Sequence, residues 1–129
     1  MTGESRVIRV AIVDDVEWVR TMLSDLLDAQ DGVEVAGTAA DGIEGVELVL
    51  QARPDITLMD LKMPKMDGIA ATQEILSRWP TARIVMNSAY GDETLIESAR
   101  MAGAVGYVTK DQRPAALIAA LLTHGRSPI

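Results

Sequence analysis

Residues 7–15 read VIRVAIVDD, a short apolar run that ends in two aspartates. Its branched apolar side chains and its length predict a buried strand rather than a helix, and the strand is expected to stop at Asp14 and Asp15. After the aspartates, apolar residues recur at the spacing of one face of a helix that runs to about Ala29. They are Val19, Met22, Leu23, Leu26 and Leu27.

The same alternation of strand and helix continues along the chain. Asp41 followed by Glu44 resembles a helix-capping pair, and a proline at position 54 ends the helix that follows it. Five strands alternating with five helices predict an α/β fold, a doubly wound parallel sheet with right-handed crossovers and helices on both faces. The remaining predicted strands are 33–38, 55–59, 82–86 and 104–108, and the remaining predicted helices are 41–53, 69–79, 92–101 and 114–123.

The composition limits the classes of function. A length of 129 residues predicts a single domain. The chain has no cysteine, which excludes thiol catalysis and zinc–thiolate sites, and its one histidine, His124, argues against a Ser-His-Asp hydrolase. A net charge of −7 has the wrong sign for binding nucleic acid over a broad surface. Neither a secretion signal nor a membrane-spanning run is evident, so we expect a cytoplasmic protein with no membrane partner.

Charged or hydroxyl-bearing residues stand where four of the predicted strands stop. They are Asp14 with Asp15, Asp60, Ser88 and Lys110. The carboxyl ends of parallel strands share one edge of the sheet, where ligands bind at a topological switch point. Two carboxylates brought together there repel each other by about 4 kcal/mol at an effective dielectric constant near 20, so the site needs a cation or raised pKa values.

Magnesium, or manganese in its place, fits this set of hard oxygen ligands. Mg²⁺ typically takes one or two carboxylates, keeps several waters and leaves room for phosphate oxygens. A carboxylate in such a site can attack a phosphoryl group and become an aspartyl phosphate. Lys110 would then neutralise charge on the phosphoryl oxygens, and Ser88 would donate a hydrogen bond to one of them.

Four stretches, in this order, resemble the receiver domain of bacterial two-component response regulators over residues 6–124. They are Val13-Asp14-Asp15, Met59-Asp60-Leu61-Lys62-Met63-Pro64-Lys65-Met66-Asp67-Gly68, Asn87-Ser88-Ala89 and Gly106-Tyr107-Val108-Thr109-Lys110. Any one stretch alone is weak evidence, but together they are specific. The resemblance implies a CheY-like, flavodoxin-like (βα)5 fold with strand order 2-1-3-4-5. It also implies a single receiver domain over residues 1–129, in which 125–129 is a tail or the start of a linker to an absent output domain.

The resemblance further implies which residues form the phosphorylation site. Asp60 would accept the phosphoryl group from a partner histidine kinase, and Asp15 and Asp60 would bind Mg²⁺ directly. Asp14 would assist through water, and the backbone carbonyl of Lys62 would be the third protein ligand.

The resemblance also implies a switch pair, Ser88 and Tyr107. In the family, the hydroxyl at the Ser88 position moves toward the phosphoryl group, and the ring at the Tyr107 position turns inward into the vacated space. Ala89 and Lys110 would contact the phosphoryl group. Phosphorylation favours the active state only by as much as it interacts differently with the two states.

Three positions refine the resemblance. Asp111 stands where the family usually has a proline after a cis peptide bond; members of the NarL/FixJ subfamily, whose output is a helix-turn-helix domain, often have aspartate there. The Lys110–Asp111 geometry stays open, because a non-proline cis bond costs roughly 3 kcal/mol. Lys62 and Tyr90 occupy variable sites that influence hydrolysis of the acyl phosphate, and their bulk predicts a partly shielded phosphoryl group.

The last predicted helix begins PAALIAALL, residues 114–122, and is apolar almost all round. A helix that covers a sheet needs only one apolar stripe, so the remainder predicts a second contact. We therefore expect a homodimer or docking surface that includes helix 114–123 and the neighbouring helix 92–101.

Three other functions share parts of the pattern. The main alternative is a Mg²⁺-dependent phosphatase or phosphotransferase with an aspartyl nucleophile, but such hydrolases of the haloacid-dehalogenase type carry an acid where this chain has Lys62. A flavin carrier of the same fold would need a phosphate loop without the acids at residues 14–17. A degenerate receiver that acts only as a scaffold is disfavoured by the complete set of acids and lysine. We expect a signalling module with slow intrinsic autophosphorylation and dephosphorylation rather than a metabolic enzyme.

Overall fold

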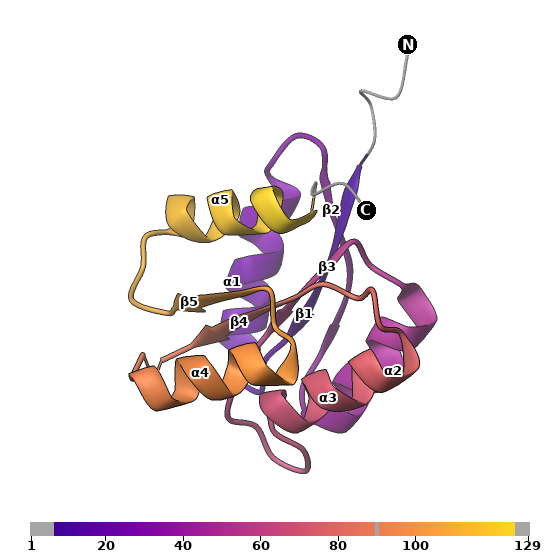
Figure 1. Ribbon diagram of the computed structural model, residues 1–129. Coiled ribbons are helices and arrows are strands. Elements are labelled where there is room, and N and C mark those ends of the chain that lie inside the picture. The colour runs from indigo at the N-terminus through magenta and orange to yellow at the C-terminus, as the bar shows by residue number, and fades with distance from the viewer. Residues whose placement is uncertain (1–6, 90, 126–129) are drawn as a thin grey trace.

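A computed structural model describes residues 7–89 and 91–125, which form a parallel sheet with helices packed on both faces (Figure 1). The hydrogen-bonded strand order is β2-β1-β3-β4-β5, and each neighbouring pair is parallel. The predicted fold class and strand order are therefore confirmed. In chain order the elements are β1 (Ile8–Val13), α1 (Glu17–Asp28), β2 (Val33–Ala39), α2 (Gly42–Ala52), β3 (Ile56–Met59), α3 (Gly68–Arg78), β4 (Ile84–Ser88), α4 (Glu93–Ala102), β5 (Gly106–Thr109) and α5 (Pro114–Gly125).

The sheet separates two apolar layers, because successive side chains of a strand point to opposite faces. On β1, Val10 and Ile12 pack in the layer that also contains buried residues of α1 and α5. Ala11 and Val13 pack in the layer with buried residues of α2, α3 and α4. Since β1 is covered on both faces, its sequence is an almost unbroken apolar run rather than an alternating one.

Two strands, β4 and β5, begin two residues later than the sequence pattern predicts. β4 begins at Ile84 rather than 82 and ends at Ser88 rather than 86, and β5 begins at Gly106 rather than 104. The reason at β5 is the end of α4, where the N–H of Ala104 still donates to the carbonyl of Ala99. The later bounds keep Ser88 inside the sheet and place Lys110 directly after β5.

The predicted capping pair at the start of α2 is confirmed. Oδ1 of Asp41 accepts a hydrogen bond from the N–H of Glu44 at 2.9 Å, and the Glu44 carboxylate accepts one from the N–H of Ala40 at 3.3 Å. Asp67 and Asp92 cap α3 and α4 in the same way as Asp41. Because Asp92 is the cap, the helix predicted over 92–101 starts one residue later, at Glu93. The helix predicted over 114–123 continues to residue 125.

The apolar face of α1 is narrower than its sequence predicts. Val19, Leu23 and Leu27 are buried, but Met22 is 48% exposed. This leaves apolar side chains of α1 at the surface beside α5. Among the described residues, no helix combines the length and the apolar character needed to cross a bilayer.

Candidate functional site

Three carboxylates meet at the carboxyl edge of the sheet. Asp14 follows β1 and Asp60 follows β3, and these two strands are hydrogen-bonded neighbours. Oxygens of Asp14, Asp15 and Asp60 all lie within 4.8 Å of one another. Asp14 and Asp60 are buried, whereas Asp15 is exposed. The site is thus an acidic pocket with one open side.

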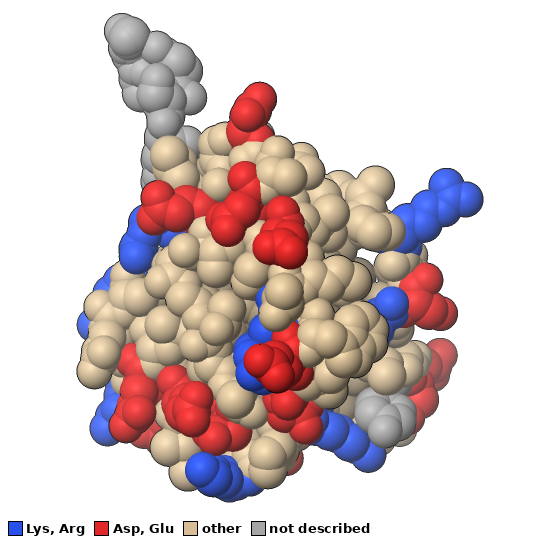
Figure 2. Space-filling model, turned by 180° about the vertical axis from the view of Figure 1, so that it is seen from behind, with Lys and Arg blue, Asp and Glu red and all other residues tan. Residues whose placement is uncertain are grey.

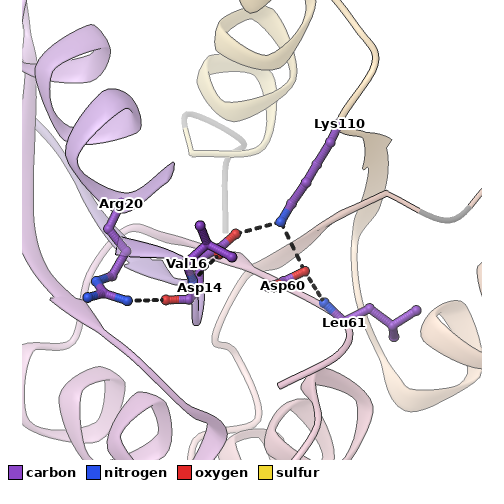
Figure 3. Close-up of polar contacts among 6 residues, drawn as sticks. All are labelled: Asp14, Val16, Arg20, Asp60, Leu61 and Lys110. Carbon is purple, nitrogen blue, oxygen red and sulfur yellow. Dashed lines mark hydrogen bonds and ion pairs between the residues drawn. The ribbon is translucent and has the colours of Figure 1, made fainter. Parts of the chain in front are cut away.

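Lys110 supplies the positive charge of this pocket (Figure 3). Its Nζ atom lies 2.7 Å from Oδ2 of Asp14 and 3.3 Å from Oδ1 of Asp60. The backbone N–H of Lys110 donates to the carbonyl of Ser88 at 2.8 Å, which fixes the start of the side chain against the end of β4. The structure therefore brings together the acids and the lysine that the strand ends predict.

The titration of the pocket follows from this crowding. Burial, and after it the charge of Asp14, raises the pKa of Asp60 to about 6. Burial alone would lower the pKa of Lys110, but its hydrogen bond to Asp14 and the charges of Asp60 and Asp14 outweigh burial, so that its pKa is raised. Lys110 thus stays protonated at neutral pH, and Asp60 sits near the point where it gains or loses a proton.

Backbone contacts hold the acids in place (Figure 3). Oδ1 of Asp14 accepts from the N–H of Val16 at 2.9 Å, and Oδ1 of Asp60 accepts from the N–H of Leu61 at 2.9 Å. The backbone carbonyl of Asp14 accepts from Nη1 of Arg20 at 2.8 Å. We did not predict this role of Arg20. In the sequence, Arg20 does not differ from other polar residues of an amphipathic helix.

The predicted switch residues lie on β4 and β5. Ser88 is the buried last residue of β4 and pairs with Thr109. Tyr107 pairs with Met86 and is half-buried. Tyr107 also lines a shallow surface pocket with Ile96 of α4 and Ala116 of α5.

The other predicted residues lie in the connecting loops. Lys62 is exposed in the segment between β3 and α3, and Ala89 is exposed directly after β4. The described residues contain no cis peptide bond, so Lys110–Asp111 is trans. Tyr90 and the predicted tail at 126–129 lie outside the described residues.

The donor set fits a divalent cation. Three carboxylates offer oxygen ligands at mutual distances that one ion can bridge, and Asp15 is exposed to solvent. Mg²⁺ prefers such hard oxygen ligands and retains waters on its open side. The net charge of three carboxylates and one lysine also leaves an excess of negative charge that a cation would offset.

Comparisons with known proteins agree with this geometry. Residues 10–122 match the family described as response regulator receiver domain. The chain is 42% identical over 113 residues to the chemotaxis protein CheY of Thermotoga maritima, covering 88% of this chain and 93% of that protein. It resembles the solved CheX-CheY-BeF3-Mg+2 complex from Borrelia burgdorferi with a TM-score of 0.85 and 31% identity, over 90% of this chain and 87% of that chain.

Some relatives are longer than this chain. The uncharacterized transcriptional regulatory protein YhcZ of Bacillus subtilis is 36% identical over 118 residues, which cover 92% of this chain but 55% of that protein. The chain therefore spans about half the length of such regulators. The family match favours a signalling domain and gives no support to the phosphatase alternative. Strand order, the grouped acids and lysine, and the match over residues 10–122 lead to one conclusion: the chain belongs to the response regulator receiver domain family of two-component systems.

Proposed function

We propose that the chain is a phosphorylation-controlled switch whose phosphoacceptor is Asp60. The observation that carries the proposal is the position of the Asp60 carboxylate, beside the ammonium of Lys110 and within 4.8 Å of Asp14 and Asp15 oxygens. A carboxylate oxygen of Asp60 forms a bond to phosphorus while the phosphorus–nitrogen bond of a kinase phosphohistidine breaks. The imidazole leaves with the electron pair and takes a proton.

The chain's own residues prepare this transfer. Lys110 approaches the Asp60 oxygen from the β5 side, where it neutralises charge on the transferred oxygens. Asp15 and Asp60, with the carbonyl of Lys62 and with Asp14 acting through water, would hold Mg²⁺, which when bound offsets the charge of the acids and phosphoryl oxygens. The solved CheX-CheY complex from Borrelia burgdorferi contains BeF3 and Mg+2, which supports this assignment.

The proposed relay runs from the pocket to the surface through Ser88 and Tyr107. Ser88 is buried at the end of β4, and its carbonyl is tied to the Lys110 N–H. The hydroxyl of Ser88 would follow the phosphoryl group, and the ring of Tyr107 would move inward behind it. Because Tyr107 lines a surface pocket with Ile96 and Ala116, this movement would change the shape of the α4–α5 face.

A second copy of the chain is the proposed occupant of the α4–α5 face in the active state. Apolar side chains remain exposed there, which is consistent with a covered surface. They include Ala115, Ala116 and Ala119 of α5 with Ile96 and Met101 of α4. Light scattering should give a larger mass with beryllofluoride and Mg²⁺ than without, and an unchanged monomer mass would contradict this part of the proposal.

The phosphodonor would approach between α1 and α5 rather than at the α4–α5 face. An apolar pocket between α1 and α5 is lined by Trp18, Met22 and Leu26 together with Lys110, so a protein seated there lies next to the phosphoacceptor. Trp18 is 68% exposed and Met22 is 48% exposed. These exposed side chains are consistent with a docked protein, and the family match makes a sensor histidine kinase the proposed partner.

Nucleic acid and membrane are not proposed partners of this domain. Acidic side chains gather in several groups on the face shown in Figure 2, with basic side chains between and around them, and the chain as a whole carries a net charge of −7. Such a surface repels phosphate backbones. We propose a cytoplasmic location, and regulation of transcription if an output domain follows, because relatives such as YhcZ are named as transcriptional regulators.

The test of the function is covalent labelling. The chain is incubated with acetyl phosphate with and without Mg²⁺, and intact mass is measured for wild type and for Asp60→Asn. We expect a Mg²⁺-dependent gain of one phosphoryl mass in wild type only. Equal labelling of the variant would remove Asp60 from its role.

A further inference from the structure

The turn before α2 contacts the loop that follows the phosphoacceptor. Asp41 is the N-cap of α2 and is 4% exposed. While its Oδ1 caps the helix, its Oδ2 lies 3.5 Å from Nζ of Lys65, which belongs to the loop between β3 and α3. One carboxylate therefore joins the start of a helix to the loop that begins at Asp60.

The backbone of this loop rests directly on α2. A Cβ atom added to Gly42 would lie 2.0 Å from the carbonyl oxygen of Met66, so only glycine allows the approach. The base of the loop is closed by a hydrogen bond of 2.7 Å from the N–H of Gly68 to the carbonyl of Leu61. The loop is thus tied at its base within its own segment and at its tip by the turn before α2.

The tip of the loop has a backbone conformation that needs outside support. Lys65 has φ of 70°, and the N–H of Met66 donates to the carbonyl of Pro64 at 2.7 Å. Together these define a γ-turn with positive φ, which is rare and strained for a residue with a side chain. Such a conformation persists where the surroundings hold it, and the ion pair with Asp41 supplies a contact at that residue.

We propose that Asp41 and Lys65 are positioning residues for the metal side of the pocket. Their ion pair holds the loop in the conformation that presents the Lys62 carbonyl to Mg²⁺, an inference that rests on the proposed function of the site. Mg²⁺ demands near-ideal octahedral geometry, so a small displacement of one carbonyl weakens its binding. Lys62 lies in the chain between the proposed phosphoacceptor Asp60 and Lys65. A change in the backbone of the γ-turn is therefore expected to displace the Lys62 carbonyl.

A purely electrostatic effect and a positioning effect predict opposite changes in Mg²⁺ affinity for one substitution, Lys65→Met. Lys65→Met removes a positive charge near a cation site, so Coulomb repulsion alone predicts tighter Mg²⁺ binding. Positioning predicts weaker binding, because the loop loses its tie to α2. Asp41→Asn weakens binding on either account, but it keeps the helix cap, since the amide oxygen still accepts from the N–H of Glu44.

The experiment measures Mg²⁺ affinity by isothermal titration calorimetry at constant ionic strength. We expect Lys65→Met and Asp41→Asn each to weaken binding about threefold to fivefold, the range that a partly exposed ion pair supports. The double variant should match either single variant, because the two residues act as a unit. If the charges act independently, the double variant returns to the wild-type affinity, and the proposal is wrong.

Matched controls separate positioning from loss of charge. Lys65→Arg keeps the ion pair and should bind Mg²⁺ like wild type. Asp92→Asn removes one negative charge from the same kind of helix cap, where Oδ1 accepts from the N–H of Leu95 at 2.8 Å, and it should also leave the affinity unchanged.

A second measurement needs no metal. Amide hydrogen exchange of the peptide covering residues 61–68 should be faster in Lys65→Met than in wild type, because the loop tip has lost its support. Unchanged exchange, or Lys65→Met affinity equal to or tighter than wild type, overturns the inference. If wild type itself fails to bind Mg²⁺ or to label at Asp60, the proposed function fails instead, so the two failures are distinguishable.

Discussion

Lys110 and Asp14 form an ion pair of 2.7 Å although they are 96 residues apart in the chain. In the sheet, β5 and β1 are separated by β4 and β3, so the lysine side chain reaches across the ends of both intervening strands. Oδ1 of Asp60, which follows β3, lies 3.3 Å from the same Nζ atom of Lys110. The ammonium of Lys110 therefore pairs with two carboxylates at once.

Lys110→Met should destabilise the fold most where Asp60 is ionised. Loss of the ammonium leaves two buried carboxylates uncompensated, and we expect the free energy of unfolding to fall by about 1–3 kcal/mol at pH 8, allowing for partial exposure of the lysine. At pH 5, where Asp60 is mostly protonated, the loss should be smaller. Urea denaturation at both pH values measures this, with Lys110→Arg as the charge-conserving control. An equal loss at both pH values would contradict the electrostatic explanation.

Asp60→Asn should stabilise the metal-free fold at alkaline pH. Because burial and the charge of Asp14 raise the pKa of Asp60 from 3.8 to about 6, the folded chain binds this proton more tightly than the unfolded chain. The stability that this proton contributes is present below pH 4 and is lost as pH rises through 6. We expect the variant to exceed wild type by about 1–2 kcal/mol at pH 8, with a difference that shrinks toward pH 4.

Denaturation in EDTA-containing buffer across this pH range measures the difference between the two chains. Asp25→Asn, which removes the charge of an exposed acid on α1, is the matched single-charge control. A difference between Asp60→Asn and wild type that does not depend on pH would argue against a raised pKa.

Mg²⁺ should raise the thermal stability of the chain through its three acids. A ligand that binds only the folded state adds about 2.7 kcal/mol at a concentration one hundred times its Kd. Asp15→Asn should weaken Mg²⁺ binding by about tenfold or more. Because Asp15 is exposed and adds to the negative charge of the pocket, its loss should not lower the metal-free melting temperature. Calorimetry with Asp25→Asn as the control distinguishes loss of a ligand from loss of one charge.

Gly68→Ala should displace the backbone of Asp60, the proposed phosphoacceptor, without changing its side chain. An added Cβ would lie 2.1 Å from the backbone carbonyl oxygen of Asp60, so the backbone must shift. We expect a loss of about 1–3 kcal/mol in stability and slower labelling by acetyl phosphate. Gly106→Ala is the comparison, because its added Cβ would meet the end of a side chain, Nε2 of His124, at 3.0 Å. Equal effects of the two substitutions would contradict this explanation.

The sequence predicted the convergence of the acids and the lysine for a physical reason. In a parallel sheet all strands end at one edge, so polar residues that follow apolar runs must meet there. The start of β5 was less predictable, because the apolar residues Ala104 and Val105 continue the strand pattern while Ala104 is still bonded to the end of α4. An apolar run does not show where pairing with the neighbouring strand begins.

Contacts made only in the tertiary structure could not be predicted from the sequence pattern in this way. The ion pair between Asp41 and Lys65 depends on the γ-turn at Lys65, and a lysine between Pro64 and Met66 does not itself predict positive φ. Arg20 likewise looked like any polar residue of an amphipathic helix. These residues gain their role from tertiary structure rather than from local pattern.

The pocket draws its parts from strands that belong to the beginning, middle and later part of the described chain. A folding intermediate in which β5 has not yet docked would lack Lys110, and its Asp60 would face Asp14 without a counter-charge. Such a species should accept no phosphoryl group. On the proposed function, phosphorylation at Asp60 would therefore be confined to chains in which the sheet is complete.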